Sequence, residues 1–152
     1  LHEKNVKMLT SLKVMSEAEI RSRYEITLDN YRKIVNIEAE TMVDMARRQI
    51  LPAVEKFSSK LAQDIAVKKS IATLVTRLSD LVEDIDAAVE DLAAALATFH
   101  KIDDVTESAN MVRDVLLPKM AALRAPCDEA EQRTAEGCWP FPTYGDLLFG
   151  VE

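Results

Sequence analysis

The clearest pattern in the sequence is a run of apolar residues, between Ile71 and Phe99, that recur every three or four positions. This spacing places one apolar stripe along an α-helix, because side chains three and four positions apart share a helical face. The acids between Asp80 and Asp91 fall off this stripe. The pattern predicts a long amphipathic helix with its acids in solvent, and Ser70 is placed to cap its start. The stripe consists of Ile71, Leu74, Leu78, Leu81, Ile85, Ala88, Leu92, Ala95 and Phe99.

A second, less regular stripe lies upstream and is interrupted by Pro52. It predicts a helix over residues 28–67. Proline removes one helical hydrogen bond and clashes with the preceding turn, so this helix either kinks near Pro52 or stops near Gln49 and restarts. No cluster of Gly, Asn or Ser flanks the proline, which favours the kink. The stripe consists of Tyr31, Ile34, Ile37, Thr41, Met45 and Arg48.

A third stripe follows a short polar join and predicts another helix. Asp103 or Asp104 is placed to cap its start. Pro118 raises the same question of kink or break, and near Pro126 the apolar pattern fades into a polar stretch that ends at Gly137. The stripe consists of Ile102, Val105, Ala109, Val112, Leu116, Met120 and Leu123.

The connections between these stripes fix the expected architecture. The joins at residues 68–70 and 100–103 are so short that consecutive helices must run antiparallel as neighbours. Ser16 and Glu19 have capping-box spacing, which predicts a short helix through about Glu25. The predicted fold is all-α: an antiparallel up-down-up bundle of three long helices in a single domain. Residues 1–27 form an N-terminal segment with a short helix, residues 28–136 the bundle, and residues 137–152 a non-helical tail.

The last fourteen residues differ in composition from the rest of the chain. They hold two prolines, two glycines and four of the eight aromatic residues. Each aromatic side chain buries about 150–250 Å² when it is sheltered, so a tail of this kind must dock on something. Packing on its own bundle is slightly favoured over docking on another polypeptide. The candidate docking residues are Trp139, Phe141, Tyr144, Leu147, Leu148 and Phe149.

Length and charge narrow the class of protein. The chain has 152 residues, enough for one proper core, and a net charge of −7, which disfavours nucleic acid and anionic membrane surfaces as partners. No apolar run is long enough to span a membrane and no signal peptide is visible. Two cysteines make no disulfide framework, so we expect a reducing, cytoplasmic location. The first residue is Leu rather than Met, which suggests a fragment of a longer protein.

No catalytic, cofactor-binding or metal-binding residue is predicted. Cys127 and Cys138 are eleven positions apart without a nearby histidine, which argues against zinc. Glycine is too scarce for a phosphate-binding loop. His100 precedes a lysine, as in histidine phosphotransfer modules, but a histidine at a helix C-terminus is also explained by the helix dipole, and we favour that interpretation.

Three stretches of the sequence contain no recognisable catalytic motif but are informative in another way. They run over residues 16–26, over residues 30–42 with 50–54, and over residues 139–149. In this order and at these distances they resemble the C-terminal region of type III glutamine synthetases, the large bacterial form. The likeness covers about Lys4 to Val151, and the tail is its most specific part.

The resemblance implies a helical extension of an enzyme. The family makes glutamine from glutamate, ammonia and ATP, with Mg or Mn, in large ring-shaped oligomers. Its metal-binding and ATP-binding residues lie in an upstream catalytic domain, so no site residue carries over to this chain. The resemblance implies a non-catalytic domain whose partners are the catalytic domain and neighbouring subunits. The alternatives are a free-standing interaction bundle or a phosphotransfer module using His100.

Overall fold

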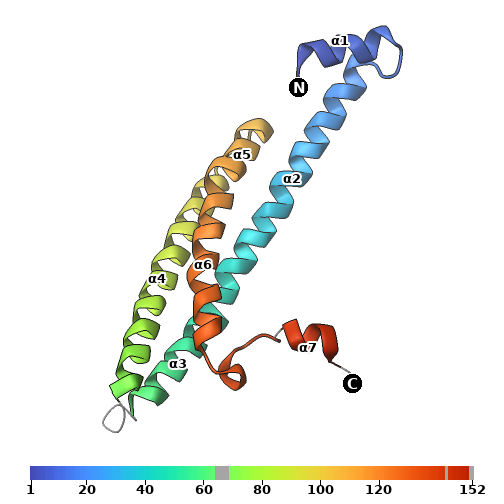
Figure 1. The fold of residues 1–152 in the computed structure, drawn as a ribbon. Helices are drawn as coiled ribbons and strands as arrows, with labels where there is room; N and C mark the ends of the chain where they lie inside the picture. The colour runs from blue at the N-terminus through green and yellow to red at the C-terminus, as the bar shows by residue number, and fades with distance from the viewer. Residues whose placement is uncertain (64–68, 143, 151–152) are drawn as a thin grey trace.

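The computed structural model describes residues 1–63, 69–142 and 144–150, without the side chains at positions 69, 70, 144 and 145. All regular structure in these residues is helical, which confirms the all-α prediction (Figure 1). The elements are α1 (Glu3–Ser11), α2 (Glu17–Met45), a π-helical turn η1 (Ala46–Ile50), α3 (Leu51–Ala62), α4 (Lys69–Phe99), α5 (Val105–Met111), a π-helical turn η2 (Val112–Leu116), α6 (Leu117–Arg133), a 3₁₀ turn η3 (Glu136–Cys138) and α7 (Tyr144–Phe149).

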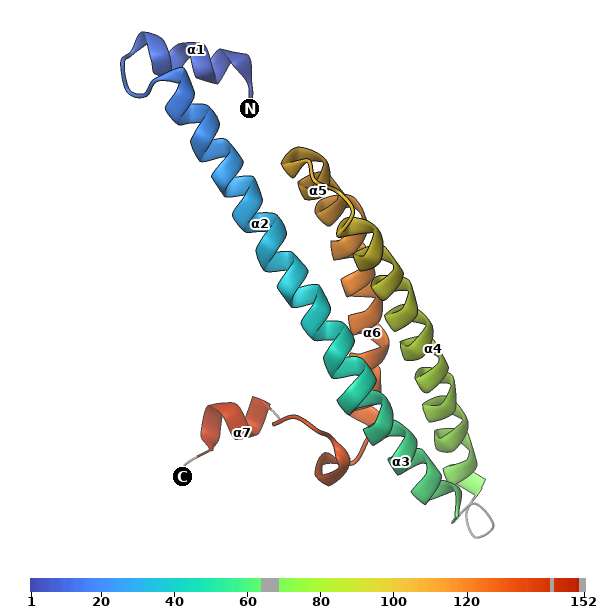
Figure 2. The ribbon, with the colours of Figure 1, turned by 180° about the vertical axis from the view of Figure 1, so that it is seen from behind.

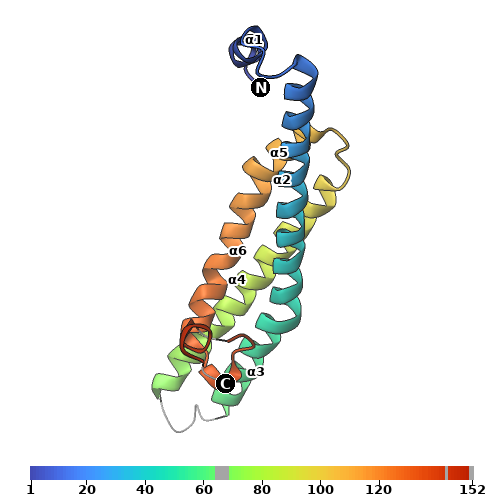
Figure 3. The ribbon, with the colours of Figure 1, turned by 90° about the vertical axis from the view of Figure 1, so that its right-hand side faces the viewer.

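Three long rods lie side by side: α2 with α3, α4, and α5 with α6 (Figures 1 and 2). Successive rods run antiparallel, as predicted. The middle rod of the chain, α4, packs along both α3 and α6, while α5 packs on α2. The first half of α2 extends beyond the ends of the other rods and carries α1 across its tip (Figures 1 and 3). The structure is therefore a compact bundle with a projecting arm.

The predicted stripe of α4 forms the centre of the core. Leu78, Leu81, Ile85 and Leu92 are fully buried, and the acids from Asp80 to Asp91 are exposed. The predicted N-cap is wrong, because α4 already includes Lys69 and Ser70 is a helical residue. The apolar pattern begins only at Ile71, so it could not show the earlier start.

The predicted face of α2 is wrong. Ile34 and Ile37 are 57% and 62% exposed, whereas Val35, Ala39 and Ala46 are buried. The helix carries two stripes, and the bundle uses the one with the smaller side chains. Because the distance between two packed helices depends on the side chains at the contact, alanines at these positions let the rods approach closely.

The start of α2 is also earlier than predicted. The expected short helix through Glu25 and the helix from Leu28 are one continuous helix beginning at Glu17. Its capping box is confirmed: the Ser16 backbone N–H donates to the Glu19 carboxylate at 2.8 Å, and the Glu19 N–H donates to Ser16 Oγ at 3.3 Å. These two bonds satisfy donors that a helix N-terminus otherwise leaves unpaired.

The helices continue through Pro52 and Pro118. For Pro52 this agrees with the favoured alternative in one respect, because the helix does not stop near Gln49; for Pro118 the sequence leaves the question of kink or break open. In each case a π-helical turn ends two residues before the proline. The Leu51 N–H donates to the Ala46 carbonyl and the Leu117 N–H to the Val112 carbonyl, each reaching five residues back. A proline ring clashes with the turn before it, and a widened turn relieves that clash.

The third rod is longer than its sequence pattern indicates. Its predicted cap is confirmed at Asp104, whose Oδ1 accepts the Glu107 N–H at 2.7 Å. Although the apolar pattern fades near Pro126, α6 continues to Arg133, within the predicted bundle of residues 28–136, and buries Cys127 and Ala130 beyond the proline. No helix in the described part of the chain is both long and apolar enough to cross a membrane.

Candidate docking surface

The first half of the tail is anchored to the bundle. Trp139 and Phe141 are half-buried and pack against the hydrophobic core. Their rings meet edge to face, with centroids 6.3 Å apart and planes at 74°. Such an arrangement matches the positive edge of one ring to the negative face of the other. For these two residues the favoured prediction, packing on the chain's own bundle, is the one observed.

The second half of the tail is not sheltered. The tail is helical at η3 and at α7, so its prediction as non-helical is wrong. Leu147, Leu148 and Phe149 of α7, which we call the α7 triad, are 68%, 71% and 79% exposed. Tyr144 opens α7, and its side chain lies outside the described residues. The predicted docking residues therefore divide into an anchored pair and an exposed triad.

A groove of about 920 Å³ lies beside the triad, between α2 with η1 on one side and α6 on the other. Sequence reasoning missed it, because its walls come from three segments far apart in the chain. Leu147 stands at the groove, so the α7 triad and this hollow are neighbours. We call it the tail groove; it is lined by Met42, Met45, Ile50, Arg124, Cys127, Asp128, Glu131, Gln132, Trp139, Phe141, Pro142 and Leu147.

Ion pairs fasten α6, one wall of the groove, to α4. Both oxygens of the Glu129 carboxylate accept hydrogen bonds from Arg77 of α4, at 2.8 and 2.6 Å, and Arg133 donates to the same carboxylate at 2.8 Å. The hydrogen bonds from Arg77 lower the pKa of Glu129 from 4.5 to about 2, with a further contribution from Arg133. Lys119 pairs with Asp91 between the same two helices. The wall is thus held in register by charge as well as by packing.

Cys127, inside the tail groove, has the chemistry of a structural residue. It is buried, and burial raises the pKa of its thiol to about 11, with the neighbouring Asp128 adding to the shift. A thiol that stays protonated near neutral pH is a poor nucleophile and a poor metal ligand. No group of three His, Cys, Asp or Glu side chains that could hold a metal ion occurs among the residues described.

His100 connects two rods at the end of α4. Its Nε2 lies 2.9 Å from Asn36 Oδ1 and 3.1 Å from Glu40 Oε1, both on α2. The ring is half exposed and therefore reachable. A phosphoryl group on Nε2 would meet the Glu40 carboxylate, and the two negative charges would repel each other. The observed geometry is that of a polar tie between α2 and α4.

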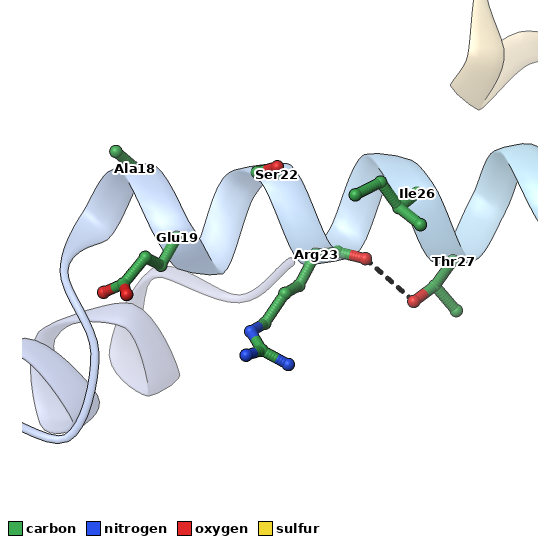
Figure 4. Close-up of a pocket in the computed structure, with 6 residues that line it drawn as sticks. All are labelled: Ala18, Glu19, Ser22, Arg23, Ile26 and Thr27. Carbon is green, nitrogen blue, oxygen red and sulfur yellow. Dashed lines mark hydrogen bonds between the residues drawn. The ribbon is translucent and has the colours of Figure 1, made fainter.

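A second hollow, of about 670 Å³, lies near the start of α2 (Figure 4). Its lining residues come from a single helix, and the Thr27 hydroxyl donates to the Arg23 carbonyl at 2.8 Å. Glu19 in this hollow already accepts the hydrogen bonds of the capping box. The hollow is open and its acid is engaged, so we assign it no chemistry. It is lined by Ala18, Glu19, Ser22, Arg23, Ile26 and Thr27.

The sequence of this chain is similar to known proteins. Residues 1–69 match the family described as the glutamine synthetase C-terminal domain. The chain is 28% identical to a glutamine synthetase of Butyrivibrio fibrisolvens, over 99% of the chain and 23% of that protein. It is 27% identical to the type-3 glutamine synthetase of Dictyostelium discoideum, over 97% of the chain and 22% of that protein. A glutamine synthetase of Bacteroides fragilis is 24% identical over 93% of the chain and 21% of that protein.

These matches extend the resemblance drawn from the sequence motifs. The chain spans less than a quarter of the length of the curated relatives it matches. The family match covers α1, α2, η1 and α3, and the alignments continue through the rest of the bundle. The chain is therefore similar along its length to glutamine synthetases, a type-3 enzyme among them, and its first 69 residues match the family described as the glutamine synthetase C-terminal domain.

Proposed function

We propose that this chain is the non-catalytic C-terminal helical domain of a longer, cytoplasmic bacterial glutamine synthetase, and that it holds neighbouring domains or subunits together. The parent enzyme would ligate ammonia to glutamate with ATP and Mg or Mn, using groups on polypeptide upstream of this chain. The domain itself would contribute contacts. The match of residues 1–69 to a glutamine synthetase C-terminal domain supports this context.

The observation that carries the proposal is the exposed α7 triad. Three consecutive large apolar side chains are each more than two-thirds exposed. Contiguous exposed apolar surface of this kind marks interaction sites in soluble proteins. Scattered exposed side chains would not carry the same weight, because single ones are normal on any surface.

The first test is the reading frame that encodes this chain. We expect it to continue upstream into a glutamine synthetase catalytic domain. A stop codon and start signal directly before Leu1 would contradict the proposal and favour a free-standing interaction bundle instead.

The second test is enzymatic. ATP-dependent formation of glutamine should be absent from the 152-residue chain and present in the full-length protein. In the full-length protein, changing Leu148 and Phe149 to Asp should impair subunit assembly. Ile37→Asp, an equally exposed position on α2, serves as the matched control and should leave assembly intact. Turnover by the isolated chain, or normal assembly of the α7 variant, would overturn the proposed role.

A further inference from the structure

The α7 triad and the tail groove form two halves of a contact on one chain. The groove is lined by apolar side chains that include Met45, Ile50 and Trp139, and by four polar ones, Arg124, Asp128, Glu131 and Gln132. The triad lies next to it but presents Leu148 and Phe149 to solvent, 71% and 79% exposed. Leu147 lines the groove, whereas Leu148 and Phe149 beside it project into solvent, so the hollow and most of the triad lie side by side.

The segment between them explains why they stay apart within one copy. Phe141 is anchored on the core, and Pro142 follows it. Proline fixes its own φ and biases the residue before it towards an extended conformation. In the fold, α7 stands off the side of the bundle (Figures 1 and 2). Leu147 stays at the groove of its own chain, while Leu148 and Phe149 remain in solvent.

We infer that the tail groove receives the α7 triad of a second copy of this chain, in a reciprocal two-fold dimer. A two-fold contact is self-complementary, so one arrangement fills both grooves and covers both triads. This inference rests on the proposed packing role of the tail and names its partner.

The expected area is sufficient for a specific contact. Burial of one Phe removes about 150–250 Å² of surface, and two Leu side chains add a comparable apolar area. Two triads and the groove walls they cover give a total on the order of 1,000 Å² or more, the size at which specific interfaces begin. A contact near that lower limit should form at micromolar rather than nanomolar concentration, because area at this size leaves little surplus over the cost of association.

The inference can be tested by sedimentation velocity of the 152-residue chain between about 5 and 200 μM, a range that brackets affinities of weak interfaces. We expect a dimer that dissociates on dilution. A triad variant (Leu148→Asp with Phe149→Asp) should be monomeric, and so should a groove variant, Met45→Glu. Both changes lie outside the packed core, and circular dichroism and thermal melting verify that each variant is folded.

Mixing the two variants is the decisive step. The triad variant retains an intact groove and the groove variant an intact triad, so the mixture regains one of the two contacts. Because one contact buries half the area, the heterodimer should be weaker than the unchanged dimer and detectable at the top of the concentration range, while each variant alone stays monomeric. Ile37→Asp, on the outer face of α2, should dimerise like the unchanged chain.

Several outcomes would overturn the inference. The first is that the unchanged chain stays monomeric at about 200 μM, roughly the upper end of the affinity range of weak interfaces. The second is that the triad variant or the groove variant still forms dimers. The third is that the mixture of the two variants does not associate. A triad that pairs with another triad, or that closes on its own groove, would produce the last result. Because the full-length assembly test uses a different protein and readout, failure of this dimer leaves the proposed packing role standing, and the reverse also holds.

Discussion

The two longest helices of this protein, α2 and α4, use their sequences in different ways. Both have about thirty residues, 29 and 31. From Leu78 to Phe99, α4 has one apolar stripe and buries all of it except Ala88, which is partly buried, against neighbours on both sides. The other helix, α2, has two stripes; the bundle covers the one that contains Val35 and Ala39, while Ile34 and Ile37 remain in solvent. An apolar stripe thus predicts a helix in both cases, but predicts the buried face only when no second stripe competes.

The largest expected effect tests this difference directly. Leu81 is fully buried on α4, so Leu81→Ala should lower the free energy of unfolding by about 2–5 kcal/mol through lost contacts and a residual cavity. Ile37→Ala on the outer face of α2 should change it by less than about 0.5 kcal/mol. Urea denaturation of both variants measures the contrast. Equal losses would show that the outer face of α2 is covered in solution.

The same contrast exists inside the tail, at a smaller scale. Trp139 packs on the core, so Trp139→Ala should cost about 1–3 kcal/mol, less than a fully buried aromatic. Phe149→Ala, at a position that is 79% exposed, should leave the stability of the monomer unchanged. Thermal unfolding at concentrations below the expected dimerisation range separates these effects. A large loss at Phe149 would mean that α7 packs on its own bundle.

Removing a helix cap should have different effects on stability in the bundle and in the projecting arm. Asp104 caps α5, which packs on α2, so Asp104→Ala should lower global stability by about 1 kcal/mol. Ser16 caps α2 at the projecting end, where little packs on it besides α1. Ser16→Ala should therefore fray the first turns locally and leave the global unfolding transition nearly unchanged. Amide hydrogen exchange would detect the fraying; a full cooperative loss would show that the arm unfolds together with the bundle.

The smallest expected effect concerns pH. The pKa of Glu129 is about 2 in the folded chain and about 4.5 when unperturbed, so folding favours its ionised form. Its contribution is present above pH 4.5 and is lost as the pH falls towards 2. Glu129→Gln should flatten the pH dependence of the melting temperature in this window, and Glu83→Gln, at an exposed position on α4, serves as the control. The effect is modest because the pair lies near solvent. An unchanged slope in Glu129→Gln would contradict the assignment.

Local signals made much of the fold predictable. The α4 stripe, the capping box at Ser16, the cap at Asp104 and the antiparallel order are each set by residues within one or two turns of each other, and all are observed. The motifs of α2 and of the tail likewise showed the resemblance to type III glutamine synthetases from the sequence alone. It agrees with the relatives found for the whole chain.

Features that depend on tertiary packing were not predictable. The choice between the two stripes of α2 depends on how closely the neighbouring helices approach, and the spacing of apolar residues within α2 does not decide it. The tail groove joins Met42, Cys127 and Trp139, which are far apart in sequence. The division of the tail into an anchored pair and an exposed triad also follows from the shape of the surface on which Trp139 and Phe141 rest.

Each π-helical turn, before Pro52 and before Pro118, adds one residue to its rod. The added residue changes the rotation of the helix after the turn relative to the helix before it. Each residue advances an α-helix by about 100°, so an extra residue rotates everything on one side of it relative to the other. With the added residue, Ala39 before the turn and Val54 after it both point into the core. Deleting a single residue from either turn would give a more regular helix, but it would swing half of that rod's apolar face away from α4. Here a local irregularity keeps a long rod aligned with its neighbours.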